Sequence, residues 1–477
     1  MGQEISSSTF CRSDFEQFEQ RLKRETDILS NWFAEDVFDC NPLQIGVELE
    51  GWLIDKHGFP ASKSEPMIAA VNDKNVVPEL AKYNFEINTK AISLGHFCLD
   101  ELYQDLKQVW QRCCNEANQL DVSAIAIGIL PTVQQSMLVA ENMYPCQRYY
   151  ALEEEINFYR KGQPVMAEIQ GIDHFQTSFY GLLLESVNTS LQIHVQICLA
   201  DSVRMYNASQ IIAAPMVAVS ANSPYLFGNN LWCETRIPIF EQSTAIPHSK
   251  NGSQATYKRA TFGQQFVASS LMELFSENLH DNLILLPELS NEPEEQLHHL
   301  RLQNGTIWRW NRPLVGMDNP AKPNLRIEHR VNPAGPSMID SIANVALFLG
   351  LLNYYARKEV PPETEITFET TASNFYRAAK DGLDCDLMWL NQKQIDITTL
   401  LLEELIPNAK IGLKTLDFDQ ELIDYYLTII EERVKRRLTG SQWQRKFIAK
   451  YGRDFNNMVY FYLDNQTQEI PVYQWNI

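Results

Sequence analysis

The sequence has no apolar run long enough to cross a membrane and no glycine-rich loop of the kinds that bind phosphate. A transmembrane helix needs about 18 or more consecutive apolar residues, and no stretch of the chain approaches that length. The Gly-x-x-x-x-Gly-Lys-Ser/Thr and Gly-x-Gly-x-x-Gly loops are missing, as is the Gly-x-Ser-x-Gly turn of serine hydrolases. A nucleotide, if one binds, must therefore be held by metal ions and side chains on another kind of surface.

Positive charge is scarce. The chain carries 40 Lys and Arg residues against 60 Asp and Glu, which gives a net charge of −20. Nucleic acids and anionic membranes bind to basic surfaces, so the sequence predicts neither as a partner. A local group of arginines and metal ions can still hold a small anion on an acidic protein. We therefore expect small-molecule partners, and the sequence leaves the oligomeric state open, a homo-oligomer included.

Cysteine pairs at metal-binding or redox spacing are also missing. The nine cysteines, an odd number, are scattered without any Cys-x-x-Cys. The chain opens without the charged and apolar regions of a secretory signal. We therefore predict a cytoplasmic protein with free, mostly buried thiols. Met1-Gly2 and Ser6 fit the short N-myristoylation pattern, which chance matches easily.

Four segments alternate apolar and polar residues in the way of half-buried strands. In Ile45–Gly51, Glu48 and Glu50 fall on one face while Val47 and Leu49 fall on the other, because strand side chains alternate. Two neighbouring carboxylates repel each other unless a cation lies between them, and Mg²⁺ prefers such oxygen ligands. The polar faces of the other three segments carry Glu86, Asn88 and Lys90; Ser190, Gln192, His194 and Gln196; and Arg326, Glu328 and Arg330.

Taken together, the four polar faces indicate one antiparallel sheet that holds metal ions and a polyphosphate. Acids, amides and a histidine supply ligands for two or three divalent cations, and Arg326 and Arg330 can direct two guanidinium groups at the same phosphate or carboxylate. Two simpler interpretations remain open. Arg326, Glu328 and Arg330 could form a ladder of ion pairs between strands, and His194 could be a hydrogen-bonded core histidine.

The order of the predicted elements indicates an α+β fold. Strand-like segments alternate with helices such as Leu99–Leu120 up to about residue 355, and Met67–Ala81 is weakly helical. Beyond Gly335-Pro336 nearly everything has helical periodicity. We predict a mainly antiparallel sheet backed by helices, with a helical C-terminal layer. The expected parts are an N-terminal helix packed on the core (residues 1–40), a catalytic α+β core (41–355) and a helical region packed on it (356–477).

Five short motifs follow one another in a characteristic order. They are Gly46-Val-Glu48-Leu-Glu50, Phe85-Glu86-Ile-Asn88, Thr189-Ser-Leu-Gln192-Ile-His194-Val-Gln196, Ala221-Asn222-Ser223-Pro224 and Arg326-Ile-Glu328-His-Arg330. With the helical segment Phe375-Tyr-Arg377-Ala-Ala-Lys-Asp-Gly382, this order resembles glutamate–cysteine ligase family 2, the carboxylate–amine ligases of the glutamine synthetase-like superfamily. The resemblance covers roughly residues 40 to 440.

The resemblance implies a concave sheet that binds Mg·ATP at one end and an acid substrate at the other. In this family ATP phosphorylates the γ-carboxylate of glutamate, and an amine, with cysteine the leading candidate, displaces phosphate to give an amide and ADP in glutathione biosynthesis. Two or three Mg²⁺ ions are implied, with Mn²⁺ as an alternative. Residue by residue, the metal ligands would be Glu48, Glu50, Glu86, His194 and Glu328, the cofactor-binding residues Gln192, Gln196, Asn222 and Ser223, and the catalytic residues Arg326 and Arg330.

The chain departs from the simplest metal site at two positions. Gln196 stands where a second histidine would strengthen the metal assignment, and the ring of His329 is expected on the back face. An acyl phosphate must be kept from water, so residues 220–258 are our candidate covering loop, and Trp232, Glu234 and Arg236 our candidate substrate contacts. Two other functions remain open: a phosphagen-kinase-like phosphotransferase on the same fold, and an inactive metabolite-binding regulator.

Overall fold

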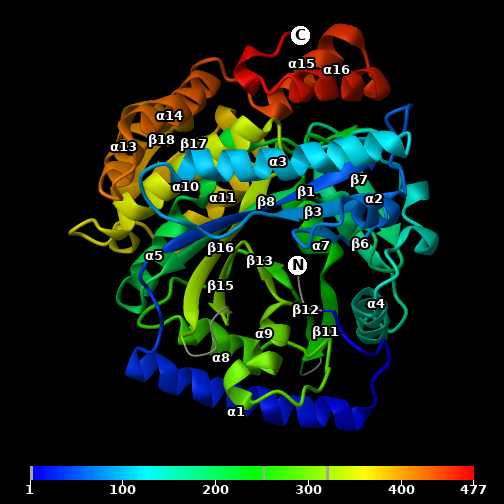
Figure 1. Cartoon of the computed structure of the whole chain (residues 1–477), viewed down its shortest axis with the longest axis vertical. Helices are drawn as coiled ribbons and strands as arrows, with labels where there is room; N and C mark the ends of the chain where they lie inside the picture. The colour runs from blue at the N-terminus through cyan, green and yellow to red at the C-terminus, as the bar shows by residue number, and fades with distance from the viewer. Residues whose placement is uncertain (1–3, 251–252, 318–321) are drawn as a thin grey trace.

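The computed structural model describes residues 4–250, 253–317 and 322–477, and its centre is a sheet of eight strands. Gly2, the site of the N-myristoylation pattern, lies outside the described residues. Helices surround the sheet on both sides (Figure 1), which confirms the predicted α+β class. The strand order is β15 (Asn311–Gly316), β16 (Asn324–Pro333), β8 (Ser190–Ile197), β1 (Gln44–Ile54), β3 (Asn84–Asn88) and β2 (Val76–Pro78), with β4 (Ile92–Ser93) and β5 (Ser123–Ile125) also paired to β1.

The four predicted polar-faced strands are neighbours in this sheet. Strands β16, β8, β1 and β3 lie side by side, and all three pairings are antiparallel. The register places Glu50 opposite Glu86 and Glu328 opposite His194. Because the side-chain period of a strand is two residues, this register brings the polar residues of all four strands to one face. Their apolar partners, among them Leu49 with 0% exposure, are buried on the other face.

The apolar face is covered by two long helices. Helix α3 (Cys98–Gln119) packs on β1 and β3 at the front of the molecule in Figure 1, and α10 (Met338–Ala356) packs on α3 and on the later helices. Helix α10 is long and apolar enough to cross a membrane, but 94% of its apolar window is buried inside the protein, so it is the central core helix. His329 stacks on Phe348 of this helix with ring centroids 4.1 Å apart, which confirms that its ring lies on the back face.

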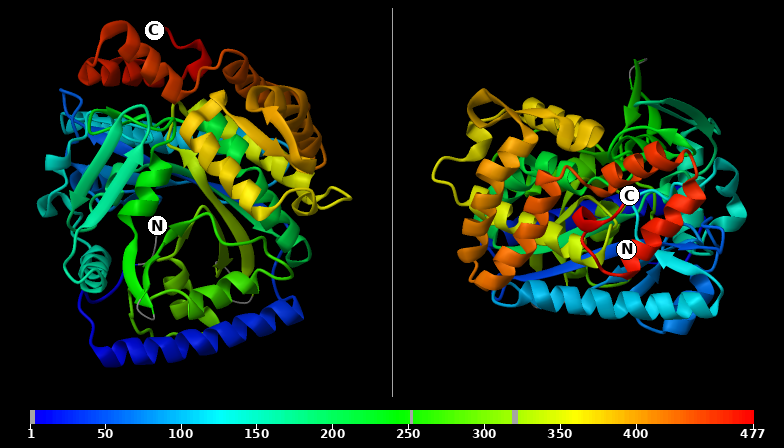
Figure 2. Two further views of the ribbon diagram at one scale, coloured as in Figure 1. Left: turned by 180° about the vertical axis from the view of Figure 1, so that it is seen from behind. Right: turned by 90° about the horizontal axis from the view of Figure 1, so that it is seen from above.

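The C-terminal region adds a mainly helical layer above the sheet (Figure 1). Its first helix, α11 (Phe368–Asp381), packs on α6 (Ala213–Ser220). A two-stranded hairpin, β17 (Asp386–Trp389) with β18 (Lys393–Asp396), interrupts the layer, so the prediction of an all-helical region is wrong there. Seen from above in Figure 2, the later helices spread over the upper side of the molecule. They are α13 (Ile406–Lys414), α14 (Gln420–Lys435), α15 (Gly440–Tyr451) and α16 (Phe455–Thr467).

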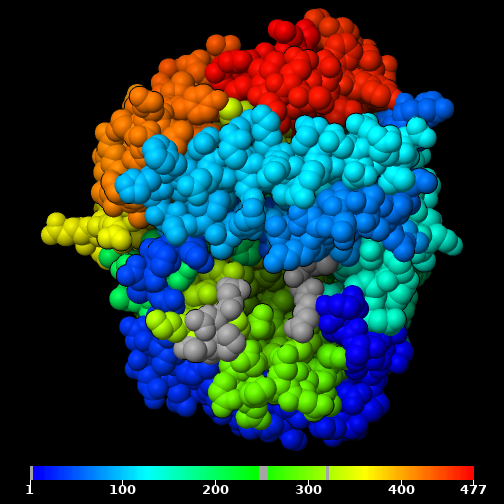
Figure 3. Space-filling view, viewed as in Figure 1, coloured from blue at the N-terminus to red at the C-terminus, as the bar shows by residue number. Residues whose placement is uncertain are grey.

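The polar face of the sheet is directed towards a second group of short elements. Helix α1 (Arg12–Glu35) lies at the lower end of the molecule in Figure 1, along α8 (Met272–His280) and α9 (His298–Asn304). Helix α4 (Gln147–Tyr159) and the hairpin of β11 (Ile246–Lys250) and β12 (Ser253–Tyr257) flank this region. The space-filling view shows the molecule hollowed between the blue upper band and the green lower part (Figure 3).

Candidate active site

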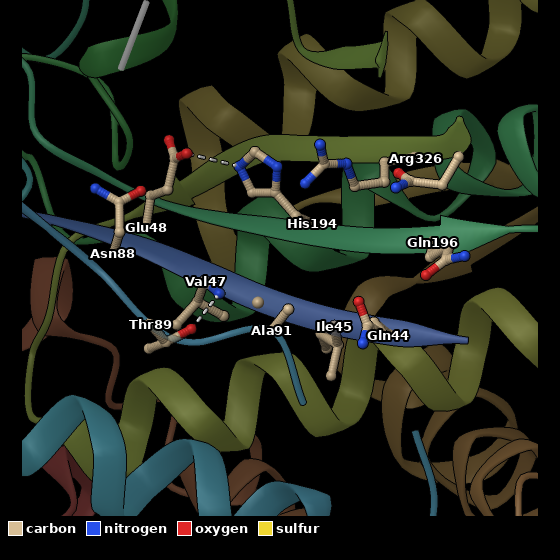
Figure 4. Close-up of a pocket in the computed structure, with 12 residues that line it drawn as sticks. Gln44, Ile45, Val47, Glu48, Asn88, Thr89, Ala91, His194, Gln196 and Arg326 are labelled. Atoms are coloured by element: carbon tan, nitrogen blue, oxygen red, sulfur yellow. Dashed lines mark hydrogen bonds and ion pairs between the residues drawn. The ribbon is translucent and has the colours of Figure 1, made fainter. Parts of the chain in front are cut away.

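The first group of possible metal ligands joins three strands of the polar face. Glu48 of β1, His194 of β8 and Glu328 of β16 each offer a ligand atom, and the three atoms lie within 4.8 Å of one another. The Nε2 atom of His194 lies 3.2 Å from Oε1 of Glu48 and 3.6 Å from Oε1 of Glu328. Figure 4 shows Glu48 and His194 directed towards each other above the sheet. Two carboxylates and an imidazole fit a divalent cation, as predicted from the sequence.

A second group lies beside the first and consists of carboxylates only. Oxygen atoms of Glu50, Glu79 and Glu86 lie within 4.8 Å of one another. Glu50 and Glu86 are paired across β1 and β3, and Glu79 follows β2 directly. Glu79 was missed because Met67–Ala81 was predicted as weakly helical, whereas a helix (α2, Ser64–Val71) and a three-residue strand share this segment.

Two carboxylates of the second group, Glu50 and Glu79, hold protons more tightly than isolated ones. Burial, followed by the neighbouring Glu86 carboxylate, raises the pKa of Glu50. Burial, followed by the charges of Glu86 and Glu50, raises the pKa of Glu79 well above its usual range. Like charges in a site poorly exposed to water favour the neutral forms. A divalent cation reverses this preference, because it replaces the protons with a shared positive charge.

Arg330 and Gln192 connect the two groups. The Nη1 atom of Arg330 lies 3.2 Å from Oε2 of Glu328 and donates a hydrogen bond to Oε1 of Gln192. Gln192 in turn donates from Nε2 to Oε1 of Glu50, at 2.8 Å. Arg236 fixes the backbone at this point by donating to the carbonyl oxygens of Arg330 and Val331, at 3.3 Å each. The Arg330 guanidinium is therefore held between the two candidate metal positions.

Arg312 is a site residue that the sequence did not predict. It lies opposite Glu328 on β15 and donates from Nε and Nη2 to the two carboxylate oxygens, at 2.6 and 2.8 Å. Burial raises the pKa of Glu328, but Arg312, Arg330 and His194 together lower it to about 2. The ion-pair ladder that remained open for this strand thus exists around Glu328. Pro313 and Gly316 concealed the strand, because neither residue is typical of a sheet interior.

Three adjoining recesses follow the polar face. The first is lined mainly by uncharged groups of β1, together with Glu48, His194, Gln196 and Arg326, whose side chains appear together in Figure 4. The second recess contains the second ligand group, Glu50, Glu79 and Glu86 (the Glu50 group), and an apolar wall. The third lies over Glu328 and Arg312 of the sheet and is also lined by Arg148 and Arg301. The apolar wall of the second recess consists of Leu80, Tyr149, Leu152, Leu182 and Trp308.

Two of the predicted nucleotide contacts are buried away from these recesses. Asn222, with 0% exposure, donates to the carbonyl oxygen of Ala334 and to the Tyr462 hydroxyl, at 2.7 and 2.8 Å. Ser223 donates to Glu234 at 2.7 Å. Neither lines a recess of the polar face, so the structure gives both a packing role instead of the predicted one. Residues 220–226 and 233–235 are likewise buried, so these parts of the predicted covering loop belong to the core, whereas residues 227–230 are partly exposed.

Comparison with known protein families assigns the chain to one of them. The sequence model described as glutamate–cysteine ligase family 2 matches residues 44–468, which is most of its length. The chain belongs to glutamate–cysteine ligase family 2. This match includes all four polar-faced strands and both groups of candidate ligands. At the family level the protein is therefore an ATP-dependent carboxylate–amine ligase. A search of curated proteins finds no match.

Solved structures agree with the family assignment at the level of the fold. A glutamate–cysteine ligase from Francisella tularensis, solved in complex with AMP, superposes with a TM-score of 0.52 at 11% identity, covering 92% of this chain and 91% of that one. A bifunctional glutathione synthetase from Pasteurella multocida superposes with a TM-score of 0.53 at 10% identity. The match covers 93% of this chain but only 55% of the longer enzyme. This family 2 ligase therefore shares its sheet architecture with both.

Proposed function

We propose that the protein uses ATP to activate the γ-carboxylate of glutamate as an acyl phosphate and joins it to an amine. One observation carries the proposal: two groups of metal-binding side chains flank the buried guanidinium of Arg330 on one sheet face. Phosphoryl transfer needs little covalent chemistry from the protein. It needs positive charge placed where the transferred group gains negative charge. The products would be an amide, ADP and phosphate.

The ligands present suit Mg²⁺, with Mn²⁺ as an alternative. Glu48, His194 and Glu328 would hold one ion, and Glu50, Glu79 and Glu86 one or two more. Bound there, the ions would neutralise the phosphate oxygens of ATP and make the terminal phosphorus easier to attack. The donor set supports this assignment, because the carboxylates of Glu50 and Glu79 have no Lys, Arg or His among their hydrogen-bond and ion-pair partners in the described chain.

The nucleotide fits the first recess and the two other substrates fit the second. The first recess is lined mainly by neutral groups, such as Gln44 and Gln196, and also contains Glu48, His194 and Arg326 (Figure 4). Such a surface suits a base and a sugar with phosphates directed at the first ligand group. The AMP bound by the Francisella enzyme supports nucleotide binding on this fold. The second recess combines Arg330 with an apolar wall, which suits an acid and the body of an amine.

The chain's own residues would then position and protect the reacting atoms. Arg330 would hold the γ-phosphoryl group between acid and nucleotide, while Arg326 binds the preceding phosphates. Arg312 keeps Glu328 ionised and oriented, so that it remains a ligand at any physiological pH. Helices α4 and α9 cover the reaction from the side opposite the sheet, through Arg148 and Gly305. Excluding water there would protect the acyl phosphate from hydrolysis.

The cellular setting follows from the same chemistry. Free glutamate, ATP and small amines occur together in the cytoplasm, and all nine cysteines of the chain are free thiols, as a reducing compartment maintains. We therefore propose a cytoplasmic enzyme acting on small molecules, without nucleic-acid or membrane partners. With cysteine as the acceptor, the product would be γ-glutamylcysteine.

The proposal predicts ADP release that depends on both an acid and an amine. Purified protein is incubated with Mg·ATP and glutamate, and ADP and phosphate are measured across cysteine, other amino acids and simple amines. We expect at least one amine to raise ADP release about tenfold or more above the hydrolytic background, with an equal amount of phosphate and a new γ-glutamyl mass. ADP accompanied by a phosphorylated product, without free phosphate, would instead identify a phosphagen-kinase-like transfer. Absence of nucleotide binding would contradict an ATP-dependent enzyme.

A further inference from the structure

Glu185 is the one carboxylate of the second recess, within the described chain, that belongs to neither ligand group. It opens a short 3-10 turn (Glu185–Val187) just before β8 and lines the recess together with Glu50 and Gln192. Its carboxylate makes no hydrogen bond and no ion pair in the described part of the chain. Burial, followed by the charge of Glu50, raises the pKa of this side chain to about 8. The side chain is partly exposed and lines the recess, so a bound cation can reach its carboxylate.

The other acids of the recess already have partners. Glu50 accepts hydrogen bonds from the backbone and hydroxyl of Ser190 and from Gln192, and Glu86 accepts one from Asn88 at 2.8 Å. Glu48 pairs with His194. Metal ions that bind to the two ligand groups would neutralise all of these acids. The charge of Arg330 acts on Glu185 and opposes the rise of its pKa, but no direct ion pair joins the two side chains in the described part of the chain.

The surroundings of Glu185 favour an organic cation over another metal ion. Leu152 and Leu182, each 3% exposed, form part of the wall, together with the rings of Tyr149 and Trp308. Metal ions prefer several oxygen ligands and bound water, which this wall does not offer. A recess that is lined by both a carboxylate and an apolar wall instead suits a molecule with an ammonium group on an apolar body.

We propose that Glu185 binds the amino group of the acceptor and that the acceptor is a primary amine with an uncharged, largely apolar body. The inference rests on the proposed function and deepens it, because it assigns the second recess to the amine and favours acceptors without a second charge over cysteine, which carries its own carboxylate. Glu185 would hold the nitrogen beside the Glu50 group, where the activated carboxyl group forms. The acid substrate would keep Arg330 and Arg148 as its partners on the other side of this recess.

The test separates use of the amine from formation of the acyl phosphate. Hydroxylamine is largely uncharged at neutral pH and traps an acyl phosphate as a hydroxamate without needing a carboxylate partner. Wild-type protein, Glu185→Gln and Glu185→Asp are compared for amide formation with the best amine and for hydroxamate formation. Glu154→Gln makes the same change on the exposed face of α4 and is the matched control. Glu185→Asp keeps the charge and serves as the conservative variant.

We expect Glu185→Gln to raise the KM for the amine about 10- to 100-fold, the range for losing a hydrogen bond to a charged group. The KM values for ATP and glutamate should change less than threefold, and the ratio of amide to hydroxamate should fall at least tenfold. Glu185→Asp should recover part of the loss. Among acceptors, amines with apolar substituents should saturate at lower concentration than lysine- or aspartate-like amines.

Three results would overturn the inference. The KM for the amine could stay within threefold of wild type in Glu185→Gln. Instead, the KM for glutamate could rise as much as the KM for the amine, which would show that Glu185 binds the acid substrate. Alternatively, Mn²⁺ binding, followed by electron paramagnetic resonance, could weaken in Glu185→Gln but not in Glu154→Gln, which would make Glu185 a metal ligand. Wild-type protein that forms neither hydroxamate nor amide would overturn the proposed function itself, and this inference with it.

Discussion

Replacing Arg330 with glutamine is expected to lower turnover about a thousandfold while the affinity for Mg·ATP falls less than tenfold. The Arg330 side chain, 13% exposed, lies between the two ligand groups and hydrogen-bonds to Gln192, so we expect it to contact the phosphoryl group where that group is transferred. Removing one preorganised donor from such a position typically lowers kcat by a factor of 10² to 10³, and loss of a transition-state arginine by more. Interactions made mainly in the transition state affect kcat more than binding.

The measurement combines steady-state kinetics with calorimetric titration of Mg·ATP. Arg330→Lys keeps the charge but loses the planar fork, and should recover only a small part of the activity. Arg12→Gln, with a side chain 92% exposed on α1, is the matched control and should behave as wild type. A kcat within tenfold of wild type in Arg330→Gln would show that Arg330 does not take part in the transfer step. If Arg330→Gln does not fold, it will show no thermal unfolding transition. The kcat of Arg330→Lys would then test whether Arg330 takes part in the transfer step.

Replacing Glu50 with glutamine should weaken metal binding and lower kcat/KM at least about 100-fold. Loss of a residue that only supports a metal ligand already lowers affinity or activity 10- to 100-fold, so loss of a ligand should do at least as much. The fold should survive, because the amide has nearly the same shape and removes one of three mutually repelling acids. Glu154→Gln is again the matched control.

The pH dependence of thermal stability gives a second readout of the Glu50 group. The folded-state pKa values of Glu50 and Glu79 lie above the ordinary value of 4.5, so the folded protein binds more protons than the unfolded chain. Without metal, stability therefore falls as the pH rises from about 4.5 through the raised values. Mg²⁺ should offset this loss, so it should raise Tm more at pH 8 than at pH 5. Glu50→Gln should lose most of that difference, and an equal Mg²⁺ effect at both pH values would contradict the ligand assignment.

The sheet could be predicted because its signal is local. Alternation of apolar and polar residues depends only on the period of a strand, and it identified β1, β3, β8 and β16 and the face on which each polar residue lies. The three residues of the first ligand group, Glu48, His194 and Glu328, all lie on these strands and were among the predicted metal ligands, but their grouping comes from the structure. The ring of His329 was placed on the back face by the same period, where burial lowers its pKa to about 3.

The missing parts of the site come from segments without such a signal. Glu79 follows a strand of three residues, too short to show a period. Glu185 and Arg148 belong to a short turn and a helix that reach the sheet only through the tertiary fold. Arg312 lies on a strand that contains a proline. The pairing of these residues with the central strands depends on long-range contacts, which the local sequence does not encode.

Asn222 and Ser223 show the opposite error. The family resemblance assigned their polar groups to ligands, whereas in the structure these groups hydrogen-bond to other parts of the protein. Asn222 connects Ala334 with Tyr462 of α16, and Ser223 binds Glu234, whose carboxylate also pairs with Arg236 at 3.1 Å. Through Arg236 this buried network supports β16 at Arg330. A sequence motif can therefore act on a site by positioning it, without touching the substrate.

Transfer of an oxygen isotope tests the proposed chemistry most directly. In that chemistry the polar face transfers a phosphoryl group from ATP to a carboxylate, whose oxygen then leaves with phosphate when the amine attacks. Glutamate labelled with ¹⁸O in its γ-carboxylate is incubated with protein, Mg·ATP and the best amine, and the phosphate is analysed by mass spectrometry. We expect one ¹⁸O atom in each phosphate released. Amine-dependent phosphate without the label would contradict an acyl phosphate and, with it, the proposed role of the two ligand groups and Arg330.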